Sequence, residues 1–329
     1  MDEIETKINM LYDFIYSNNH NNQNDFKDIN IDLENISIDD IKIKFEGDKY
    51  DDILSSLFNG KFKMVDFNEN TNNLILKRYT DGLSISLFIS PYNNEININD
   101  MNEINNNDCL FSYILSTLVL SNKTKHIALP IINVDVKFSQ MNDIIKPYGD
   151  VYKNYIEMIK EEQISNIFSV RVKENFFKSI SLIEFIKSSE CDYKKLLFQI
   201  IHTLAVLQKE YPGFRHNMLN LSNIYVYLKK GETDKYKYNN TNFYIPNNTF
   251  EIKITNFFAA NIPDMYGVNP DGPLNIPFFD DNNAYFDLHY FLNNLLKLVD
   301  TSDIKLDINT MEFMDKVIPE NIELIRRCI

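Results

Sequence analysis

The chain has 329 residues, and 44% of them are hydrophobic, which is enough to fill the core of one large domain or of two lobes. Its formal net charge of −14 argues against nucleic-acid binding, because phosphate recognition needs a basic surface. The acidic first residues lack a signal-peptide core, and no run approaches the ~20 apolar residues of a membrane span, so we expect an intracellular protein that is not secreted.

The first 45 residues predict an extension that precedes the folded part of the chain. Apolar positions between residues 3 and 17 recur at helical spacing. The tract that follows, residues 18–24, consists of Asn, His and Gln and indicates a loop.

Residues 46–175 predict a β-rich lobe with one helix. The candidate strands lie at residues 61–67, 73–79, 83–90 and 167–173. Residues 108–120 have the apolar spacing of a helix, and residues 94–107 are predicted as a solvated loop before it. Residues 138–165 are predicted as a partly helical insertion.

Residues 176–329 predict a helical lobe. A short helix is expected at 181–189 and a long one at 193–211, which Pro212 and Gly213 would end. The polar tract 229–250 is predicted as a hairpin or a loop.

Three segments of the helical lobe carry a recognisable pattern. Residues 214–223 read Phe-Arg-His-Asn-Met-Leu-Asn-Leu-Ser-Asn. Residues 251–258 form an apolar strand that ends in Asn-Phe-Phe. Residues 284–292 read Ala-Tyr-Phe-Asp-Leu-His-Tyr-Phe-Leu, with Asp287 early in a helix that is apolar on most sides.

In order and spacing these segments resemble the protein-kinase-like proteins of large AT-rich DNA viruses, the poxvirus and giant-virus relatives of Ser/Thr kinases. Protein kinases carry H-R-D-L-x-x-x-N in the catalytic loop and D-F-G after the next strand. The resemblance covers residues 193–295 and extends more weakly over 50–329. It implies an α+β, two-lobed fold with a small antiparallel N-lobe and a helical C-lobe, shortened because only 42 residues follow Asp287.

The residues that the resemblance would assign to catalysis are replaced. Met218 stands where kinases have the Asp that accepts the substrate proton, and Asn256 where they have the Asp that binds magnesium. A thioether is a poor proton acceptor, and an amide offers Mg²⁺ one neutral oxygen instead of two charged ones. The positions that remain form a vestigial kinase motif: His216, Asn217, Asn223, Phe257 and Asp287.

The nucleotide-binding parts are reduced as well. Gly60 is one glycine where the kinase loop over the phosphates has three. Two alternatives remain open for the lysine of the third strand: it is Lys77, or its position is taken by Phe88. The lysine's partner in the following helix would be Asp108, unless Asp108 serves as the helix N-cap.

The resemblance and its losses predict a catalytically inactive pseudokinase with absent or weak binding of ATP and magnesium. We expect it to act through protein partners, an active kinase or virion proteins, in the host cytoplasm or the virion. The alternative is a divergent active phosphotransferase that recruits an acid from the loop at 261–283: Asp264, Asp271, Asp280 or Asp281. No metal site is expected, since the three cysteines, Cys109, Cys191 and Cys328, are far apart and indicate reduced thiols.

Overall fold

The computed structural model describes most of the chain after residue 34. The described residues are 35–42, 62–68, 73–78, 84–95, 97–141, 146, 149–175, 179–188, 191–263, 265–267, 284–302 and 304–317. The helix predicted at 3–17, Gly60, Cys328 and the four loop acids lie outside them. The chain divides into two compact units, Met1–Ser116 with Ala128–Phe177 and Thr117–Ile127 with Lys178–Ile329.

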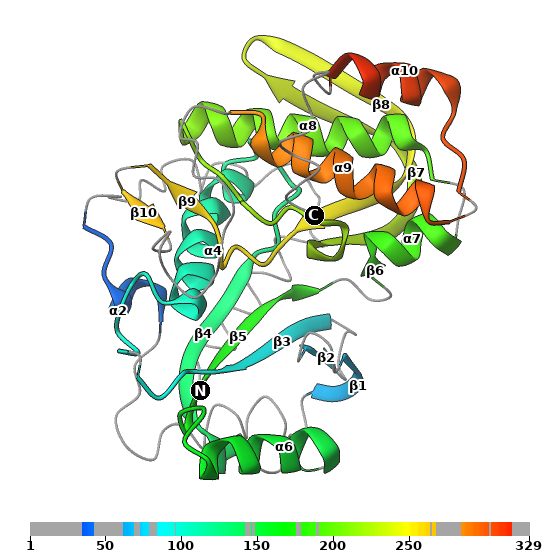
Figure 1. Ribbon diagram of the computed structural model, residues 1–329. Coiled ribbons are helices and arrows are strands. Elements are labelled where there is room, and N and C mark those ends of the chain that lie inside the picture. The colour runs from blue at the N-terminus through cyan, green and yellow to red at the C-terminus, as the bar shows by residue number, and fades with distance from the viewer. Residues whose placement is uncertain are drawn as a thin grey trace. The chain divides into compact units, whose positions relative to one another are not determined.

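The first unit contains a five-stranded antiparallel sheet in the order β1-β2-β3-β5-β4 (Figure 1). Its strands are β1 (Phe62–Asn68), β2 (Asn73–Arg78), β3 (Ser84–Pro91), β4 (Pro130–Lys137) and β5 (Ile167–Asn175). The four strands predicted from the sequence are confirmed, each to within two residues.

Both faces of this sheet are covered, which explains why β5 is buried along almost its whole length. Side chains of a strand alternate between the two faces. Phe168 packs edge-on against Tyr155 of helix α6 (Gly149–Lys160), at 5.1 Å between ring centroids. The alternate positions, Arg171 and Lys173, meet helix α4 (Ile104–Leu120) on the other face.

Helix α4 begins at Ile104, four residues earlier than predicted, so the expectation of a solvated loop up to residue 107 is wrong. Glu103 and Asn106 are buried. The Glu103 carboxylate accepts the N–H groups of Asn105 and Asn106, and the Asn106 side chain donates to two carbonyls of the preceding loop. Paired polar side chains therefore extend the helix where their hydrophilicity suggested a loop.

A short helix before the sheet, α2 (Ile38–Ile41), packs onto the first unit. Lys42 is 5% exposed, and its Nζ donates to the Asp135 carboxylate of β4 at 3.0 Å and to the Tyr92 hydroxyl. The Asn133 side chain also donates to the Ile41 carbonyl. The last described part of the predicted extension is thus joined to the sheet.

The second unit is mainly helical. Its helices are α7 (Leu182–Ser188), α8 (Tyr193–Glu210), α9 (Phe286–Asp300) and α10 (Ile308–Val317). The helices predicted at 181–189 and 193–211 are confirmed as α7 and α8. The Asp192 side chain caps α8 by accepting from the Lys195 N–H, and Leu196 and Ile200 bury its apolar face.

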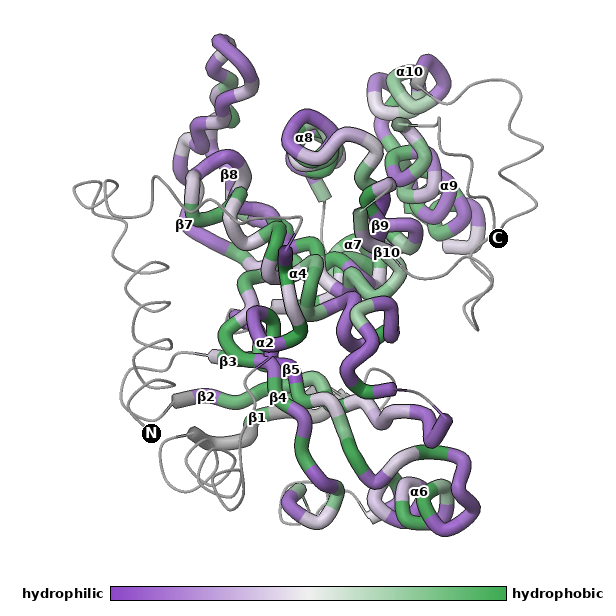
Figure 2. The backbone as a smooth tube through the Cα atoms, turned by 90° about the vertical axis from the view of Figure 1, so that its left-hand side faces the viewer, coloured by the Kyte–Doolittle hydropathy of each residue, from purple (hydrophilic) through white to green (hydrophobic). Residues whose placement is uncertain are grey.

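The polar tract after the loop is a long hairpin of two strands, β7 (Ile224–Tyr238) and β8 (Thr241–Ile254), flanked by the short strand β6 (Ile180–Ser181). Figure 2 shows mostly hydrophilic residues along the far end of this hairpin. A second small pairing joins β9 (Asn261–Ile262) to β10 (Tyr266–Gly267). An antiparallel sheet in one unit and helices in the other give the α+β class that the sequence predicts.

Candidate functional site

The loop at 214–223 leaves α8 through a tight turn. Gly213 has φ +79°, and a Cβ on it would lie 2.8 Å from Pro263 Cγ, so only glycine fits without movement. Arg215 and Asn261 exchange both backbone hydrogen bonds, each at 2.9 Å. The loop is therefore fastened to the segment that follows the Asn-Phe-Phe tract.

Asp287, in the first turn of α9, binds the backbone of the loop at 214–223. Its side chain is 4% exposed, and its two carboxylate oxygens accept the N–H groups of His216 at 2.7 Å and Asn217 at 2.9 Å. Burial raises the pKa of Asp287 to about 6, and the two hydrogen bonds oppose this rise. The prediction of a buried Asp287 bound to these amides is confirmed.

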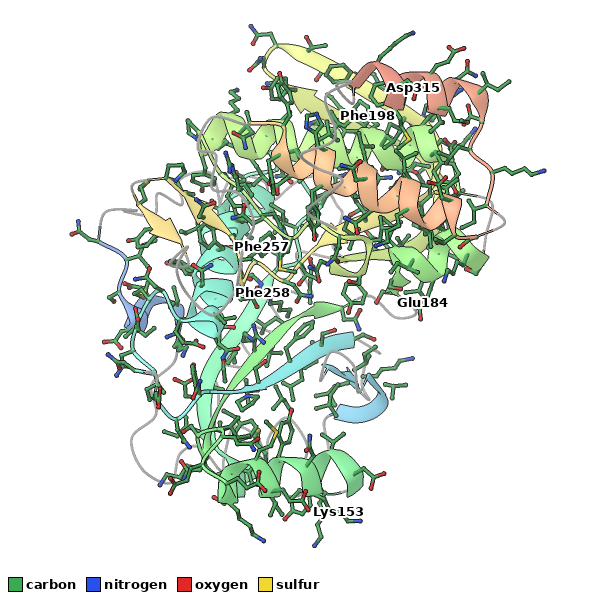
Figure 3. All side chains as sticks on the ribbon, viewed as in Figure 1. Lys153, Glu184, Phe198, Phe257, Phe258 and Asp315 are labelled. Carbon is green, nitrogen blue, oxygen red and sulfur yellow. The ribbon has the colours of Figure 1, made fainter. Side chains whose placement is uncertain are left out.

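His216 packs in the core, as expected. Its Nε2 lies 3.0 Å from the Thr255 carbonyl, so this nitrogen carries the proton that the carbonyl accepts. Its ring centroid lies 5.1 Å from that of Phe257, which is fully buried (Figure 3). The contact joins the loop to the end of β8.

Asn217 replaces the arginine of the kinase pattern and makes a different set of bonds. Its Nδ2 donates to the Ala259 carbonyl at 2.8 Å and to Asn261 Oδ1 at 3.0 Å. Its φ of +60° is left-handed, a conformation that Asn tolerates better than most residues. The amide thus crosslinks the loop to the turn after Phe257 without a charge.

The two residues at the metal-binding positions bind each other. Asn256 Nδ2 donates to Asn223 Oδ1 at 2.8 Å, and Asn223 Nδ2 donates to the Met218 carbonyl at 2.8 Å. Asn256 also has a left-handed φ of +63°. A carboxylate at position 256 could not donate to Asn223 Oδ1 and would need a cation between the oxygens, whereas the Asn256 amide donates to it directly.

The described residues show no cluster typical of a metal centre. Among them, no group of three or more His, Cys, Asp or Glu side chains could hold a metal ion. Cys109 and Cys191 are free thiols, and burial raises the pKa of each to about 12. Thiols with such pKa values are poor nucleophiles and poor ligands at neutral pH.

The first unit contains an ion pair that the sequence analysis missed. Lys173 Nζ lies 2.8 Å from Asp108 Oδ2, and Arg171 donates to the same oxygen at 2.7 Å. Burial lowers the pKa of Lys173, while Asp108 opposes this change. Arg171 and Lys173 alternate with Val170 and Val172 in the predicted strand, and this pattern was a signal that the strand has a charged face.

The same pair decides the role of Asp108. Asp108 lies in the second turn of α4, so the N-cap alternative is wrong. Among the strands that the structure describes, Phe88 lies on β3 and Lys77 on β2. The Lys173 ammonium lies 5.5 Å from the Phe88 ring centroid, in cation–π contact. A lysine of β5 therefore makes the bond to the helix that kinases make from the third strand.

No protein-family model matches the chain. Among curated proteins it is similar to three of Acanthamoeba polyphaga mimivirus. Uncharacterized protein R402 is 28% identical over 91% of this chain and 34% of its own length. "Putative serine/threonine-protein kinase R400" is 28% identical over 56% of this chain and 44% of its own length. A second protein of that description, R301, is 33% identical over 40% of this chain and 36% of its own length.

Solved structures give a weaker likeness. WaaP in complex with acyl carrier protein has a TM-score of 0.39 and 10% identity, over 84% of this chain and 93% of that one. The kinase domain of PF14_0431 has a TM-score of 0.34 and 12% identity, over 88% of this chain and 90% of that one. These TM-scores are too low to support a conclusion about function.

The loop geometry agrees with the kinase-like pattern inferred from the sequence, and the three relatives are proteins of a giant virus. The chain is similar to kinase-like proteins of such viruses, as the sequence analysis inferred. It spans between about a third and just under half of the length of these relatives. In the described part of the chain, no helix combines the length and apolar character that crossing a membrane requires.

Proposed function

We propose that this chain is a pseudokinase, a kinase-like protein that transfers no phosphate and acts by binding other proteins. The observation that carries the proposal is the hydrogen bond between Asn256 and Asn223, together with Met218 in the loop. The oxygen that Asn223 would offer a metal already accepts a hydrogen bond from Asn256, and no carboxylate stands at either aspartate position of the kinase pattern.

The chemistry of phosphoryl transfer explains why these changes matter. The transition state carries charge that kinases balance with magnesium, and a carboxylate orients the attacking hydroxyl. Loss of a single electrostatic stabiliser typically reduces a rate ~100- to 1,000-fold. Losing the base and the metal ligand together would leave almost no transfer.

The partners follow from the class of protein and not from a described interface. We propose an active kinase or virion proteins as partners, in the host cytoplasm or the virion. The insertion at 138–165 is a candidate surface, because α6 exposes Asp150 and Lys153 while Tyr155 is buried against the sheet.

A divergent active phosphotransferase is the second candidate, and one observation favours it. The buried pair of Asp108 and Lys173 retains a lysine–carboxylate bond between sheet and helix, which active kinases need. The names of two relatives, "Putative serine/threonine-protein kinase R400" and "Putative serine/threonine-protein kinase R301", agree with this candidate. In this alternative an acid of the loop at 261–283 would replace the lost aspartates.

Phosphate transfer to a generic acceptor protein, measured with radiolabelled ATP and Mg²⁺ or Mn²⁺, separates the two candidates. We expect the wild type to remain at the level of the Asn223→Ala variant. Magnesium-dependent turnover that Asn223→Ala abolishes would contradict the pseudokinase proposal and support the second candidate.

A further inference from the structure

The second unit contains a cavity of about 580 Å³ that the kinase-like loop does not reach. Leu197, Phe198 and Ile201 of α8 form one wall. Tyr238 and Phe243 of the hairpin form the second wall, and Phe313 of α10 the third. None of its lining residues belongs to the loop at 214–223 or to the Asn-Phe-Phe tract.

The hairpin reaches this position because it bends. The pairing of β7 with β8 shifts register between Leu228 and Glu232 and again between Glu232 and Asp234. Such bulges bend a strand and increase its twist. At the bend, the buried Asp234 carboxylate binds Lys229, Asn248 and Lys125, the last at 2.9 Å. A charged cluster therefore fixes the direction of the far half of the hairpin.

The far half is then packed rigidly against α8. Tyr236 is 4% exposed and meets Phe198 edge-on at 5.1 Å between ring centroids. Phe198 also contacts Phe243 at 5.7 Å, and Tyr236 stacks on His126 at 5.5 Å. Two of these rings, Phe198 and Phe243, therefore hold the hairpin on α8 and also line the cavity (Figure 3 labels Phe198).

The lining selects an uncharged, apolar occupant. No described lining residue is acidic, and the charged one among them, Lys194, is exposed. His202 bonds the Lys237 carbonyl through Nε2, and burial lowers its pKa, so the ring stays neutral at pH 7. Phe243 and Phe313, each 38% exposed, leave apolar ring surface open to the cavity.

The surroundings favour a small molecule over a protein. The exposed apolar side chains of Tyr244 and Met311 do not line the cavity, so the site that we consider is limited to its own lining. Side chains alternate across a strand, so Tyr244 points away from the face that Phe243 shares with α8. The volume lies within the range of sites for small ligands. We propose that the cavity binds a compact, uncharged apolar molecule, independently of the kinase-like loop.

Fluorescence titration of the full chain with N-phenyl-1-naphthylamine, an uncharged aromatic probe, tests this site. We expect saturable binding of one probe per chain. Ala205→Phe fills the cavity from α8 and should weaken binding at least tenfold. Leu228→Ser removes an apolar side chain that is 71% exposed and lines no part of the cavity, and it should leave binding unchanged.

Three outcomes would overturn the proposal: no saturable binding, unchanged affinity in a folded Ala205→Phe variant, or equal loss in Leu228→Ser, which would indicate adhesion to the general surface. Cooperative thermal melting establishes whether Ala205→Phe folds. If it does not fold, Phe243→Ser at the open rim decides in its place. A tenfold loss in that variant supports the site, and unchanged affinity refutes it.

Discussion

Asp287 is a buried carboxylate whose two oxygens each accept a backbone N–H of the loop. Removing it strands the amides of His216 and Asn217 in a buried site, and hydrogen bonds to a charged group contribute ~1.5–3 kcal/mol each. We expect Asp287→Ala to lower the free energy of unfolding by about 3 kcal/mol or more, measured by urea denaturation. Asp300→Ala, exposed at the end of the same helix, is the matched control and should change little. Equal urea midpoints in the two variants would show that Asp287 does not anchor the loop.

The same residue gives a pH dependence whose sign is fixed by its raised pKa. The pKa is about 6 in the folded state against 3.8 as the ordinary value, so between these values the folded chain binds the additional proton. Stability from this group is complete below pH 3.8 and is lost as pH rises through 6, by up to about 3 kcal/mol. Urea midpoints of wild type and Asp287→Asn should therefore converge or cross as pH rises from 4 to 6.5. A constant difference would show that the pKa is not raised.

At the scale of elements, α4 is held to β5 by one carboxylate that faces two cations. Asp108 is the acceptor for both Arg171 and Lys173, and all three are at most 8% exposed. Breaking a buried pair by removing one partner is costly, because the remaining charge stays buried. We expect Asp108→Asn to destabilise the chain by ~3–5 kcal/mol.

Asp150→Asn on α6 makes the same change at a fully exposed carboxylate of the first unit, and should leave the melting temperature unaltered. Adding Lys173→Met to Asp108→Asn removes one of the stranded cations, so the double variant should regain part of the loss. If the double variant is as unstable as the sum of the single changes, the two residues are not coupled.

The elements that the sequence predicted are those with a local signal. Helix α8 has an apolar stripe, an Asp192 cap and a Pro-Gly stop, all within one segment. The position of Asp287 could be predicted because the order of the three kinase-like segments specified it. The bond between Asn256 and Asn223 joins residues 33 apart in the chain, and the pairing of Lys173 with Asp108 joins residues 65 apart. Spacing along one sequence does not identify the partner of each residue in such pairs, so these parts of the site required the structure.

At the scale of the whole molecule, we expect the chain to bind a nucleoside triphosphate poorly. Its net charge of −14 disfavours a polyanion, and each sequence feature that kinases use for phosphates is reduced. The segment that we expect to match the kinase phosphate loop has one glycine, Gly60, where kinases have three, and β3 carries Phe88 at the candidate lysine position.

We therefore expect no magnesium-dependent ATP binding at micromolar concentrations, measured by isothermal titration of the full chain. The Asn256→Asp variant is the informative comparison. It replaces the amide that donates to Asn223 with a carboxylate, so Asn223 Oδ1 and two charged oxygens would face one another. Mg²⁺ alone should then raise the melting temperature of the variant and leave the wild type unchanged, because a cation relieves the lack of a donor and binds carboxylate oxygen. Micromolar ATP binding by the wild type that depends on magnesium would contradict this prediction and would favour the active phosphotransferase.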